Sequence, residues 1–374
     1  MKIGINALCA ENRSGTGRYA SRLLPALGKF DSDNEYVVLL NADSPLREEL
    51  ADFPNFQCFP VNIPNVAARL WFEKFRLKRW ILGEQIDVFH GPAFIIPPKC
   101  PVPAVVTIHD LVFHLFPETT PVSRRQHYRR AIPRSIREAA MILADSRSTA
   151  RDLHEHLDVS PGKIEVSYLG VEEEFFEDPL PNEMEEVRRK YELPGPFLLS
   201  LGTMEPRKNL PGLLRAYSML RHSDPDTPDL VVVGRRGWGV GKLRDLVAEL
   251  SLEGMVHFPG FVEDADLPAL YRLSDLFICL SLYEGFGLPV LEAMASGVPV
   301  VASDCSSIPE ITGDKALLVN PEDTKQVVRT IAECLADAEE SRTRAVEARE
   351  RARHFNWLTT AEEALNAYKK ALRQ

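Results

Sequence analysis

The sequence predicts an α/β protein made of two Rossmann-like halves. Short apolar segments of strand length alternate with longer amphipathic segments along most of the 374 residues, which is typical of strand–helix units around a parallel sheet. The length exceeds one ordinary core and suits two α/β domains. An acidic, proline-containing stretch at 170–195 interrupts the alternation. We therefore expect a first domain at 1–175, a linker at 176–195, a second domain at 196–355 and a C-terminal helix within 356–374.

Six strands are expected in each half. In the first half they lie at 2–7, 36–40, 86–90, 103–109, 140–145 and 163–168. In the second half they lie at 196–201, 230–233, 255–259, 275–280, 298–302 and 315–319. The C-terminal segment has the apolar spacing of a helix, and Thr359 and Thr360 before Glu362 and Glu363 predict a capped start.

Charge and cysteine usage exclude several classes of protein. The net charge is −10, and it is uneven: residues 1–175 carry 21 Lys and Arg against 22 Asp and Glu, while the remainder carries 23 against 32. An acidic total argues against general nucleic-acid binding. The six scattered cysteines form no metal-binding spacing, and neither a signal peptide nor an 18-residue apolar run is present. We expect a reduced, cytoplasmic protein.

The N-terminal segment "SGTGRYA" satisfies the letter pattern of a dinucleotide-binding loop through Gly15 and Gly17. In that fold the first glycine follows the first strand almost at once. Here seven residues separate Ala7 from Gly15, which argues against a nicotinamide or flavin site. Two alternatives remain: a loop before a helix at 17–29, or a helix N-terminus whose amides approach an anion or a sugar hydroxyl.

The segment "EGFGLPVLEAMASG" indicates a ligand site in the second half. Glu284 ends the loop after strand 275–280, and a helix is expected near Leu288 with Pro289 in its first turn, which places Glu292 one turn inside. Carboxylates are strong acceptors for sugar hydroxyls, and the amides of Phe286, Gly287 and Leu288 suit an anion such as a diphosphate. The alternative is that Glu284 is only a cap and Glu292 only a polar helix face.

Two further groups follow strands. After strand 196–201, Arg207 and Lys208 precede Asn209, an expected helix N-cap. Adjacent cations at such a turn suit a diphosphate and would stabilise it as a leaving group, although alone they could be solvated surface charge. In the first half, His109 and Asp110 end strand 103–109, where an active-site histidine and a satisfied core histidine are the two interpretations.

Two other patterns need an interpretation. The D-x-D triplets at 31–33, 224–226 and 264–266 lie in polar turns or caps, and we interpret them as turn residues rather than metal ligands. Residues 69–80, "RLWFEKFRLKRW", interleave five basic residues with four aromatics, and 124–137 adds six arginines. A basic, aromatic helix suits an anionic membrane surface, and a helix packed on the core with a basic solvated face is the alternative.

Together these motifs resemble the retaining glycosyltransferases of family 4, and the likeness extends over essentially the whole chain. The E-x7-E pair followed by "AMASGVPVVAS" is its most specific part. The matching residues are Gly15, Gly17, His109, Gly202, Arg207, Lys208, Asn209, Glu284 and Glu292.

The resemblance implies the GT-B fold, with two Rossmann-like domains facing each other across a cleft and a C-terminal helix that returns to the first domain. It implies that Arg207 and Lys208 hold the donor diphosphate and that Glu292 binds the ribose hydroxyls. Glu284 would contact the transferred sugar, and His109 would lie at the reacting centre. It also implies donor contacts from Gly15, Gly17, Gly202, Phe286, Gly287 and Leu288, and reading of the base by the backbone of Phe261 and Val262.

The expected reaction is a hexose transfer with retention and without a metal or other cofactor, by front-face attack of the acceptor on the donor. The segments "VVVGRRGWG", "TIHDLVFHLFPE" and "HGPAFIIPP" resemble those of bacterial O-antigen and exopolysaccharide mannosyltransferases, so GDP-mannose is the expected donor and a lipid-linked or polysaccharide glycan the acceptor. Where the family commonly has N-G-V-D, this chain has Leu169-Gly170-Val171-Glu172. That departure bears on the contacts between the two domains and not on the class of enzyme.

Several alternatives stay open. The same class of enzyme could use a UDP-, ADP- or dTDP-sugar, because differences of one hydroxyl depend on positions that no motif fixes. A sugar-nucleotide 2-epimerase and a non-catalytic glycan- or nucleotide-binding protein are the others.

Overall fold

The computed structural model describes residues 1–12, 14–63, 65–119, 122–235 and 240–374. It describes only the backbone of residues 66, 67, 119, 122–124 and 240. Two compact units make up the chain. The first is formed by Met1–Gly170 together with Asn356–Gln374, and the second by Val171–Phe355.

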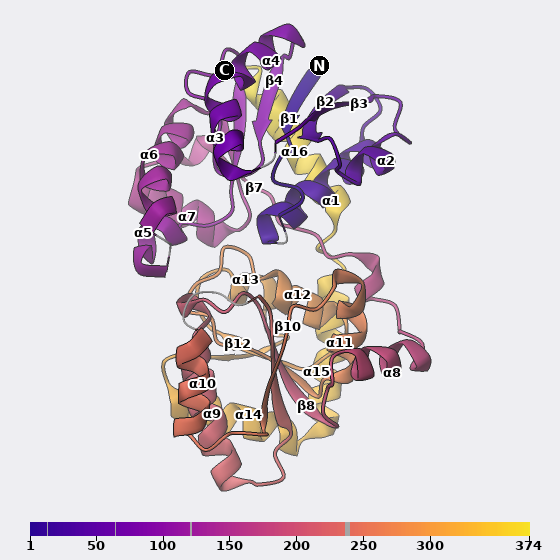
Figure 1. Cartoon of the computed structure of the whole chain (residues 1–374), viewed down its shortest axis with the longest axis vertical. Helices are drawn as coiled ribbons and strands as arrows, with labels where there is room; N and C mark the ends of the chain where they lie inside the picture. Colours follow the sequence, from indigo (N-terminus) through magenta and orange to yellow (C-terminus); the bar gives the residue numbers. More distant parts are fainter. Residues whose placement is uncertain (13, 64, 120–121, 236–239) are drawn as a thin grey trace. The chain divides into compact units, whose positions relative to one another are not determined.

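The first unit contains a parallel sheet with the strand order β3-β2-β1-β4-β5-β6-β7 (Figure 1). Its strands are β1 (Lys2–Asn6), β2 (Glu35–Asn41), β3 (Phe56–Val61), β4 (Val88–Gly91), β5 (Ala104–Ile108), β6 (Met141–Ala144) and β7 (Ile164–Val166). Each of the six expected strands is present within a few residues of its predicted bounds. The strand β3 was not predicted. It lies at the sheet edge and contains Pro60. Proline has no amide hydrogen to donate to a neighbouring strand, and an edge strand tolerates it because that strand has a neighbour on one side only.

Helices cover both faces of this sheet. They are α1 (Gly15–Phe30), α2 (Leu46–Leu50), α3 (Val66–Phe75), α4 (Leu77–Gly83), α5 (Val112–Leu115), α6 (Val122–Glu138), α7 (Arg147–Leu157) and α16 (Trp357–Ala371). Figure 1 shows α16 lying beside α1, and it also packs on β5 and β6. Residues of α4, α6 and α7 form a separate buried apolar cluster with the strands. The C-terminal helix therefore completes the core of the first unit.

The predicted start of the C-terminal helix was wrong. The cap is Asn356, whose side chain accepts from the Thr359 amide at 2.9 Å, and not Thr359 or Thr360. The Thr360 hydroxyl instead donates to the Tyr168 carbonyl at 2.7 Å. That bond ties the helix to the chain segment that follows β7.

The second unit contains a parallel sheet with the order β10-β9-β8-β11-β12-β13. Its strands are β8 (Phe197–Leu201), β9 (Asp229–Val233), β10 (Val256–Gly260), β11 (Leu276–Cys279), β12 (Val300–Ser303) and β13 (Leu317–Val319). All six were expected. Strands buried on both faces are near-continuous apolar runs, and these segments show that pattern.

Two layers of helices enclose the second sheet. Helices α9 (Leu210–Ser223), α10 (Val240–Glu249) and α14 (Thr324–Ala336) pack together, and α11 (Leu267–Leu273), α12 (Leu288–Ala295) and α15 (Ala338–Ala352) form the other group. The short α13 (Ile308–Thr312) packs on α12. The expected linker, 176–195, belongs to this unit and includes α8 (Pro181–Lys190), which packs on α11.

Candidate functional site

The strand order of the second sheet marks where a ligand would bind. The chain runs outward from β8 through β9 to β10, and then returns to the other side of β8 as β11. In open parallel sheets such a reversal leaves a crevice at the carboxyl ends of the two strands, where ligands bind. A pocket lies at these ends, lined by Ser200, Leu201, Gly202, Lys208, Leu210, Val232, Cys279, Leu280 and Ser281.

The loop after β8 supplies two cations. Pro206–Lys208 is one turn of 3-10 helix, and Asn209 follows with φ 51°. A Cβ on Gly202 would lie 3.0 Å from Lys208 Cε, so the glycine leaves room for the lysine side chain. Asn209 is the N-cap residue of α9, as predicted, but its side chain makes no capping hydrogen bond and donates to the Pro321 carbonyl at 2.9 Å instead. That bond ties the loop to the turn before α14.

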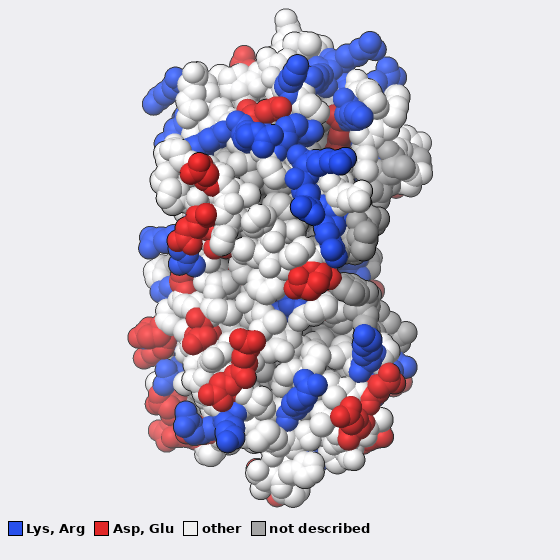
Figure 2. Space-filling view, turned by 90° about the vertical axis from the view of Figure 1, so that its left-hand side faces the viewer, with Lys and Arg blue, Asp and Glu red and all other residues white. Residues whose placement is uncertain are grey.

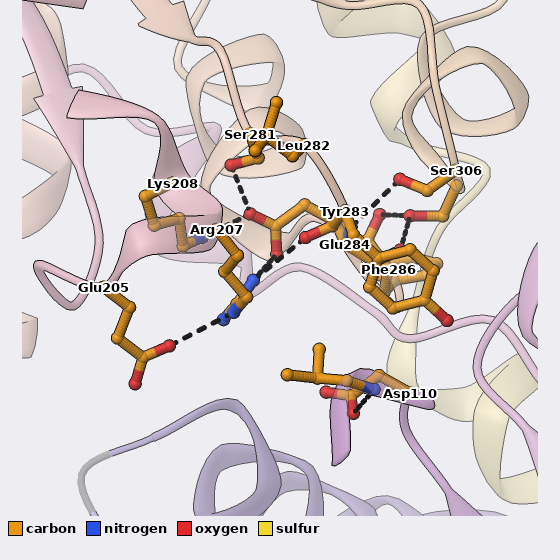
Figure 3. A network of polar contacts seen from close by, with 12 residues as sticks. Asp110, Glu205, Arg207, Lys208, Ser281, Leu282, Tyr283, Glu284, Phe286 and Ser306 are labelled. Carbon is orange, nitrogen blue, oxygen red and sulfur yellow. Dashed lines mark hydrogen bonds and ion pairs between the residues drawn. The ribbon is translucent and has the colours of Figure 1, made fainter. Parts of the chain in front are cut away.

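The loop after β11 brings Glu284 onto these cations (Figure 3). Arg207 Nη1 donates to Glu284 Oε2 at 2.8 Å, and Lys208 Nζ donates to Glu284 Oε1. Arg207 also donates through Nε to Glu205 Oε2 at 3.1 Å and through Nη1 to the Tyr283 carbonyl at 3.1 Å. We call Glu205, Arg207, Lys208 and Glu284 the charged cluster. It holds two cations and two carboxylates.

The electrostatics of Glu284 are those of a buried counter-ion. The residue is 6% exposed. Burial alone would raise the pKa of its carboxyl, but Arg207 and Lys208 outweigh burial and hold the pKa at about 2. The Ser281 hydroxyl adds a hydrogen bond of 2.6 Å. Glu284 is therefore ionised at neutral pH, and both cations lie against it.

Two serines after β12 shape the Glu284 loop, and no motif had indicated them. The Glu284 amide donates to Ser306 Oγ at 3.0 Å, and Ser307 Oγ lies 3.0 Å from the Glu284 carbonyl and 2.6 Å from the Phe286 carbonyl. The only signal in the sequence is that "SDCSS" follows a strand adjacent to β11 in the sheet. Neighbouring parallel strands end at one edge, so polar residues after β12 reach the loop after β11.

Helix α12 begins where the sequence predicted. It starts at Leu288 with Pro289 in its first turn, and Gly287 before it has φ 105°. The amides of Val290 and Leu291 donate to the Gly287 carbonyl. Among the residues that the structure describes, none accepts a hydrogen bond from the amides of Gly287 and Leu288. The positive end of the helix is thus available to an anion at this edge of the sheet.

Glu292 lies one turn inside α12, as expected from the sequence. It is 2% exposed, and its carboxylate accepts from the Tyr271 hydroxyl of α11 at 2.7 Å. Contact with a ribose would need Glu292 or Tyr271 to move. Phe261 and Val262 follow directly after β10; Val262 is buried and Phe261 partly exposed. Their predicted roles, like that of Glu292, stay predictions.

In the first unit, His109 follows β5 and is held on both ring nitrogens. Nδ1 lies 2.7 Å from Asp145 Oδ2, and Nε2 lies 2.9 Å from the Pro92 carbonyl. Burial would lower the pKa of His109, but the Asp145 carboxylate outweighs burial and raises it above 6.5. A carbonyl and a carboxylate are both acceptors, so the geometry favours an imidazolium that donates from both nitrogens. A substrate hydroxyl would reach a ring nitrogen only by replacing one of these bonds.

The two glycines of "SGTGRYA" differ in the space around them. Gly15 begins α1, and a Cβ there would meet nothing within 4 Å. Gly17 is buried, and a Cβ would lie 1.9 Å from the Asn12 carbonyl oxygen and 3.0 Å from that of Cys9. The second glycine lets the loop after β1 pack on the first turn of α1.

We expect Gly17→Ala to destabilise the first unit by about 2 kcal/mol, because the loop backbone must shift to admit the methyl group. Gly15→Ala is the matched control and should be neutral or slightly stabilising. Urea unfolding measures both. Nucleoside diphosphate affinity, which we assign to the second unit, should stay unchanged in each variant. Equal stability of the two variants would contradict the packing role of Gly17.

In each of the D-x-D triplets one aspartate accepts hydrogen bonds from other groups of the protein. Asp31 accepts from the Tyr36 hydroxyl at 2.6 Å and from the Asn34 side chain at 2.8 Å. Asp266 accepts from Lys190 and from the Tyr191 hydroxyl. In the third triplet, Asp224 accepts from the Asp226 amide at 3.0 Å. The contacts of Asp31 and Asp224 are local, as expected for turn residues, whereas Asp266 binds residues at the end of α8.

Solved structures with the same fold define the class of this protein. Anabaena HepE, solved in complex with UDP-glucose, has a TM-score of 0.75 at 20% identity, with 98% of each chain covered. WaaG, a glycosyltransferase involved in lipopolysaccharide biosynthesis, has a TM-score of 0.73 at 17% identity, with 98% of this chain and 99% of that chain covered. The two Rossmann-like units therefore have the GT-B fold, as predicted.

Sequence comparisons identify the family. Residues 13–175 match glycosyltransferase family 4, and residues 183–352 match the glycosyl transferases group 1. The O-antigen chain mannosyltransferase B of Escherichia coli is 34% identical over 296 residues, 79% of this chain and 77% of the relative. The serotype-specific mannosyltransferase WbdA of Escherichia coli is 33% identical over 237 residues, 63% of this chain but only 29% of that longer protein. The chain belongs to glycosyltransferase family 4, and it is a glycosyltransferase.

Proposed function

We propose that this protein transfers mannose from GDP-mannose to a lipid-linked or polysaccharide acceptor in cell-surface glycan synthesis. In this proposal the anomeric configuration is retained and the enzyme uses no metal or other cofactor. The observation that carries the proposal is the charged cluster, in which two cations lie at the point of the second sheet where ligands bind in this class of fold.

The chemistry of glycosyl transfer suits this cluster. Cleavage of the bond between the sugar and the diphosphate leaves positive charge on the anomeric carbon and a diphosphate leaving group. Stabilising that leaving group is the largest task, and groups fixed in place before the reaction do it most effectively. Arg207 and Lys208 are fixed by Glu284, by Glu205 and by the Tyr283 carbonyl. They would bind the diphosphate together with the N-terminus of α12.

The other residues keep the roles that the family resemblance implies. As the diphosphate binds the two cations, the Glu284 carboxylate becomes available to accept from the hydroxyls of the transferred sugar. The departing phosphate oxygen takes the proton of the acceptor hydroxyl, which attacks on the face that the leaving group vacates. Glu292 binds the ribose, the backbone of Phe261 and Val262 reads the base, and His109 contacts the donor sugar or acceptor.

The proposed donor and location rest on the relatives. The Escherichia coli proteins at 33–34% identity are named as an O-antigen chain mannosyltransferase and a serotype-specific mannosyltransferase. The "VVVGRRGWG" segment that suggested the same group lies partly outside the described residues, at 236–239. Among the described helices, none is long and apolar enough to cross a bilayer. We propose that the enzyme works in the cytoplasm.

A thermal-shift screen of GDP-mannose, UDP-glucose, ADP-glucose and dTDP-glucose tests the donor. A ligand that binds only the folded state raises the melting temperature in proportion to the logarithm of its concentration over Kd. We expect stabilisation by GDP-mannose and by GDP, and little by the other sugars. Greater stabilisation by a UDP-, ADP- or dTDP-sugar would contradict GDP-mannose as the donor, but the protein would still be a glycosyltransferase.

Product analysis tests the reaction itself. We expect transfer of mannose only when a mannose-terminated acceptor is present, an α-linkage by NMR from the α-configured donor, and full activity after dialysis against a chelator. A 2-epimerase would convert the nucleotide sugar without an acceptor. A binding protein would retain the nucleotide with no turnover. Inversion, or loss of activity with the chelator, would contradict retention or metal independence respectively.

A further inference from the structure

The basic aromatic segment of the first unit is divided between core and surface. The helix predicted by its pattern is in fact two: α3 ends at Phe75 and α4 begins at Leu77. Trp80 is 7% exposed and packs with the apolar core of the unit. Trp71 and Phe75, in contrast, are 54% and 55% exposed. The core therefore accounts for Trp80, as one of the two interpretations expected, but not for Trp71 and Phe75.

The exposed aromatics form one patch with cations. Trp71 and Phe75 are one helical turn apart, and their ring centroids are 6.0 Å apart. Arg76 lies over the Trp71 ring at 5.9 Å, and Lys74 over the Phe75 ring at 5.0 Å. Leu70 is also exposed at 38%. The result is a hydrophobic wedge whose neighbours carry positive charge.

The single acidic residue of 69–80 is directed away from solvent. Glu73 accepts from the Asn6 side chain at 3.1 Å and from Arg69 at 2.8 Å, and its side chain is only 12% exposed. No carboxylate of this segment is therefore placed among the exposed Lys74, Arg76 and Arg79. The positive charge of the surface is uncompensated within the segment.

Helix α6 extends the positive charge. Phe72 of α3 and Tyr128 of α6 pack against the same apolar core cluster of the first unit. Arg129, Arg130 and Arg137 of α6 are exposed; the side chain of Arg124 lies outside the described residues. Figure 2 shows Lys and Arg gathered over this side of the first unit, with Asp and Glu in the minority there. This distribution is notable in a chain whose net charge is −10.

We propose that this surface, defined by Leu70, Trp71, Lys74, Phe75, Arg76 and Arg79, binds an anionic lipid bilayer. Exposed aromatic rings insert at the boundary between headgroups and acyl chains, while Lys and Arg are attracted to anionic headgroups. The two chemistries occur together on α3 and the start of α4, and a purely polyanionic partner would not need the exposed aromatic rings. The inference rests on the lipid-linked acceptor of the proposed function, because it brings the enzyme to the surface where such an acceptor lies.

Vesicle sedimentation tests the surface. Purified full-length protein is mixed with vesicles of phosphatidylcholine alone, and with vesicles in which phosphatidylglycerol replaces part of the phosphatidylcholine. We expect binding that rises with phosphatidylglycerol and falls with added salt. Lys74→Glu combined with Arg79→Glu should lower the partition coefficient by about 25-fold or more, at roughly fivefold for each cation removed. Trp71→Ser combined with Phe75→Ser should weaken binding at every lipid composition.

The matched control uses Arg342 and Val346 of α15, which are exposed and one turn apart like Trp71 and Phe75. Arg342→Glu combined with Val346→Ser should bind as the unchanged protein does. Circular dichroism and transfer to a water-soluble acceptor show that every variant is folded. Binding that ignores phosphatidylglycerol, or that the surface variants leave unchanged, overturns the proposal. If the protein then still transfers mannose to the soluble acceptor, the proposed function stands without the lipid-binding surface. If it binds the vesicles as expected but transfers no sugar, the proposed function is wrong and the lipid-binding surface stands.

Discussion

Glu284→Gln should bind nucleoside diphosphate about tenfold more tightly and turn over roughly a hundredfold more slowly than the unchanged enzyme. The carboxylate is ionised, 6% exposed and paired with both Arg207 and Lys208. An incoming diphosphate must therefore compete with it for both cations. The amide keeps the shape and removes the competing charge, so binding improves. It is a weaker acceptor for the sugar hydroxyls, so turnover falls.

Titration calorimetry with GDP and steady-state transfer from GDP-mannose measure the two effects. Glu205→Gln is the matched control, because Glu205 also pairs with Arg207 but is more exposed and does not contact Lys208 in the described interactions. This substitution should change the affinity for GDP by no more than about threefold, because a partly exposed ion pair contributes little free energy. Weaker GDP binding by Glu284→Gln would contradict the role of Glu284 as counter-ion to the cations.

Asp145→Asn should lower the free energy of unfolding by about 3 kcal/mol near neutral pH, the scale of breaking a buried pair from one side. His109 donates to Asp145 and to the Pro92 carbonyl, and the paired carboxylate raises the pKa of His109 above 6.5. The protonated His109 stabilises the folded state fully below 6.5, the pKa of histidine in the unfolded chain. This contribution is lost as the pH rises through the higher pKa of His109 in the folded protein. The cost of the substitution should therefore be largest at acidic pH and shrink in alkaline solution.

Urea unfolding at about pH 6 and about pH 9 checks this pH dependence. Asp110→Asn is the matched control: Asp110 adjoins His109, but its carboxylate accepts from the Val112 amide at 3.0 Å, a bond that asparagine preserves. It should alter the pH dependence little. A cost of Asp145→Asn that is independent of pH would show that His109 is neutral in the folded protein. A fall in turnover with unchanged GDP affinity in Asp145→Asn would support the predicted place of His109 at the reacting centre.

The alternation of strands and helices made the fold predictable, and the exceptions have local causes. Strand β3 contains Pro60, which weakens a strand pattern although an edge position tolerates it. Asn209 and the two threonines before Glu362 are good capping residues, but tertiary contacts engage Asn209 and Thr360 with the carbonyls of Pro321 and Tyr168. Propensity describes what a residue does locally, and such contacts override it.

The sequence indicated Arg207, Lys208 and Glu284 of the candidate site, but not their pairing, and it did not indicate Glu205, Ser306 or Ser307. Arg207, Lys208 and Glu284 were each expected after a strand, but their contact depends on β8 and β11 being neighbours, which periodicity does not reveal. The same holds for His109 and Asp145, which follow the adjacent strands β5 and β6. His109 and Asp145 are 36 residues apart in the chain, and the order of the strands explains their hydrogen bond because β5 and β6 end at the same sheet edge.

A crystal structure of the protein with GDP tests the central claim most directly. We expect the diphosphate oxygens within hydrogen-bond distance of Arg207 and Lys208, at about 3 Å, with the Glu284 carboxylate turned from at least one of these cations. The amides at the start of α12 should face the same diphosphate. A diphosphate bound elsewhere, with the bonds of Glu284 to both cations unchanged, would contradict the account.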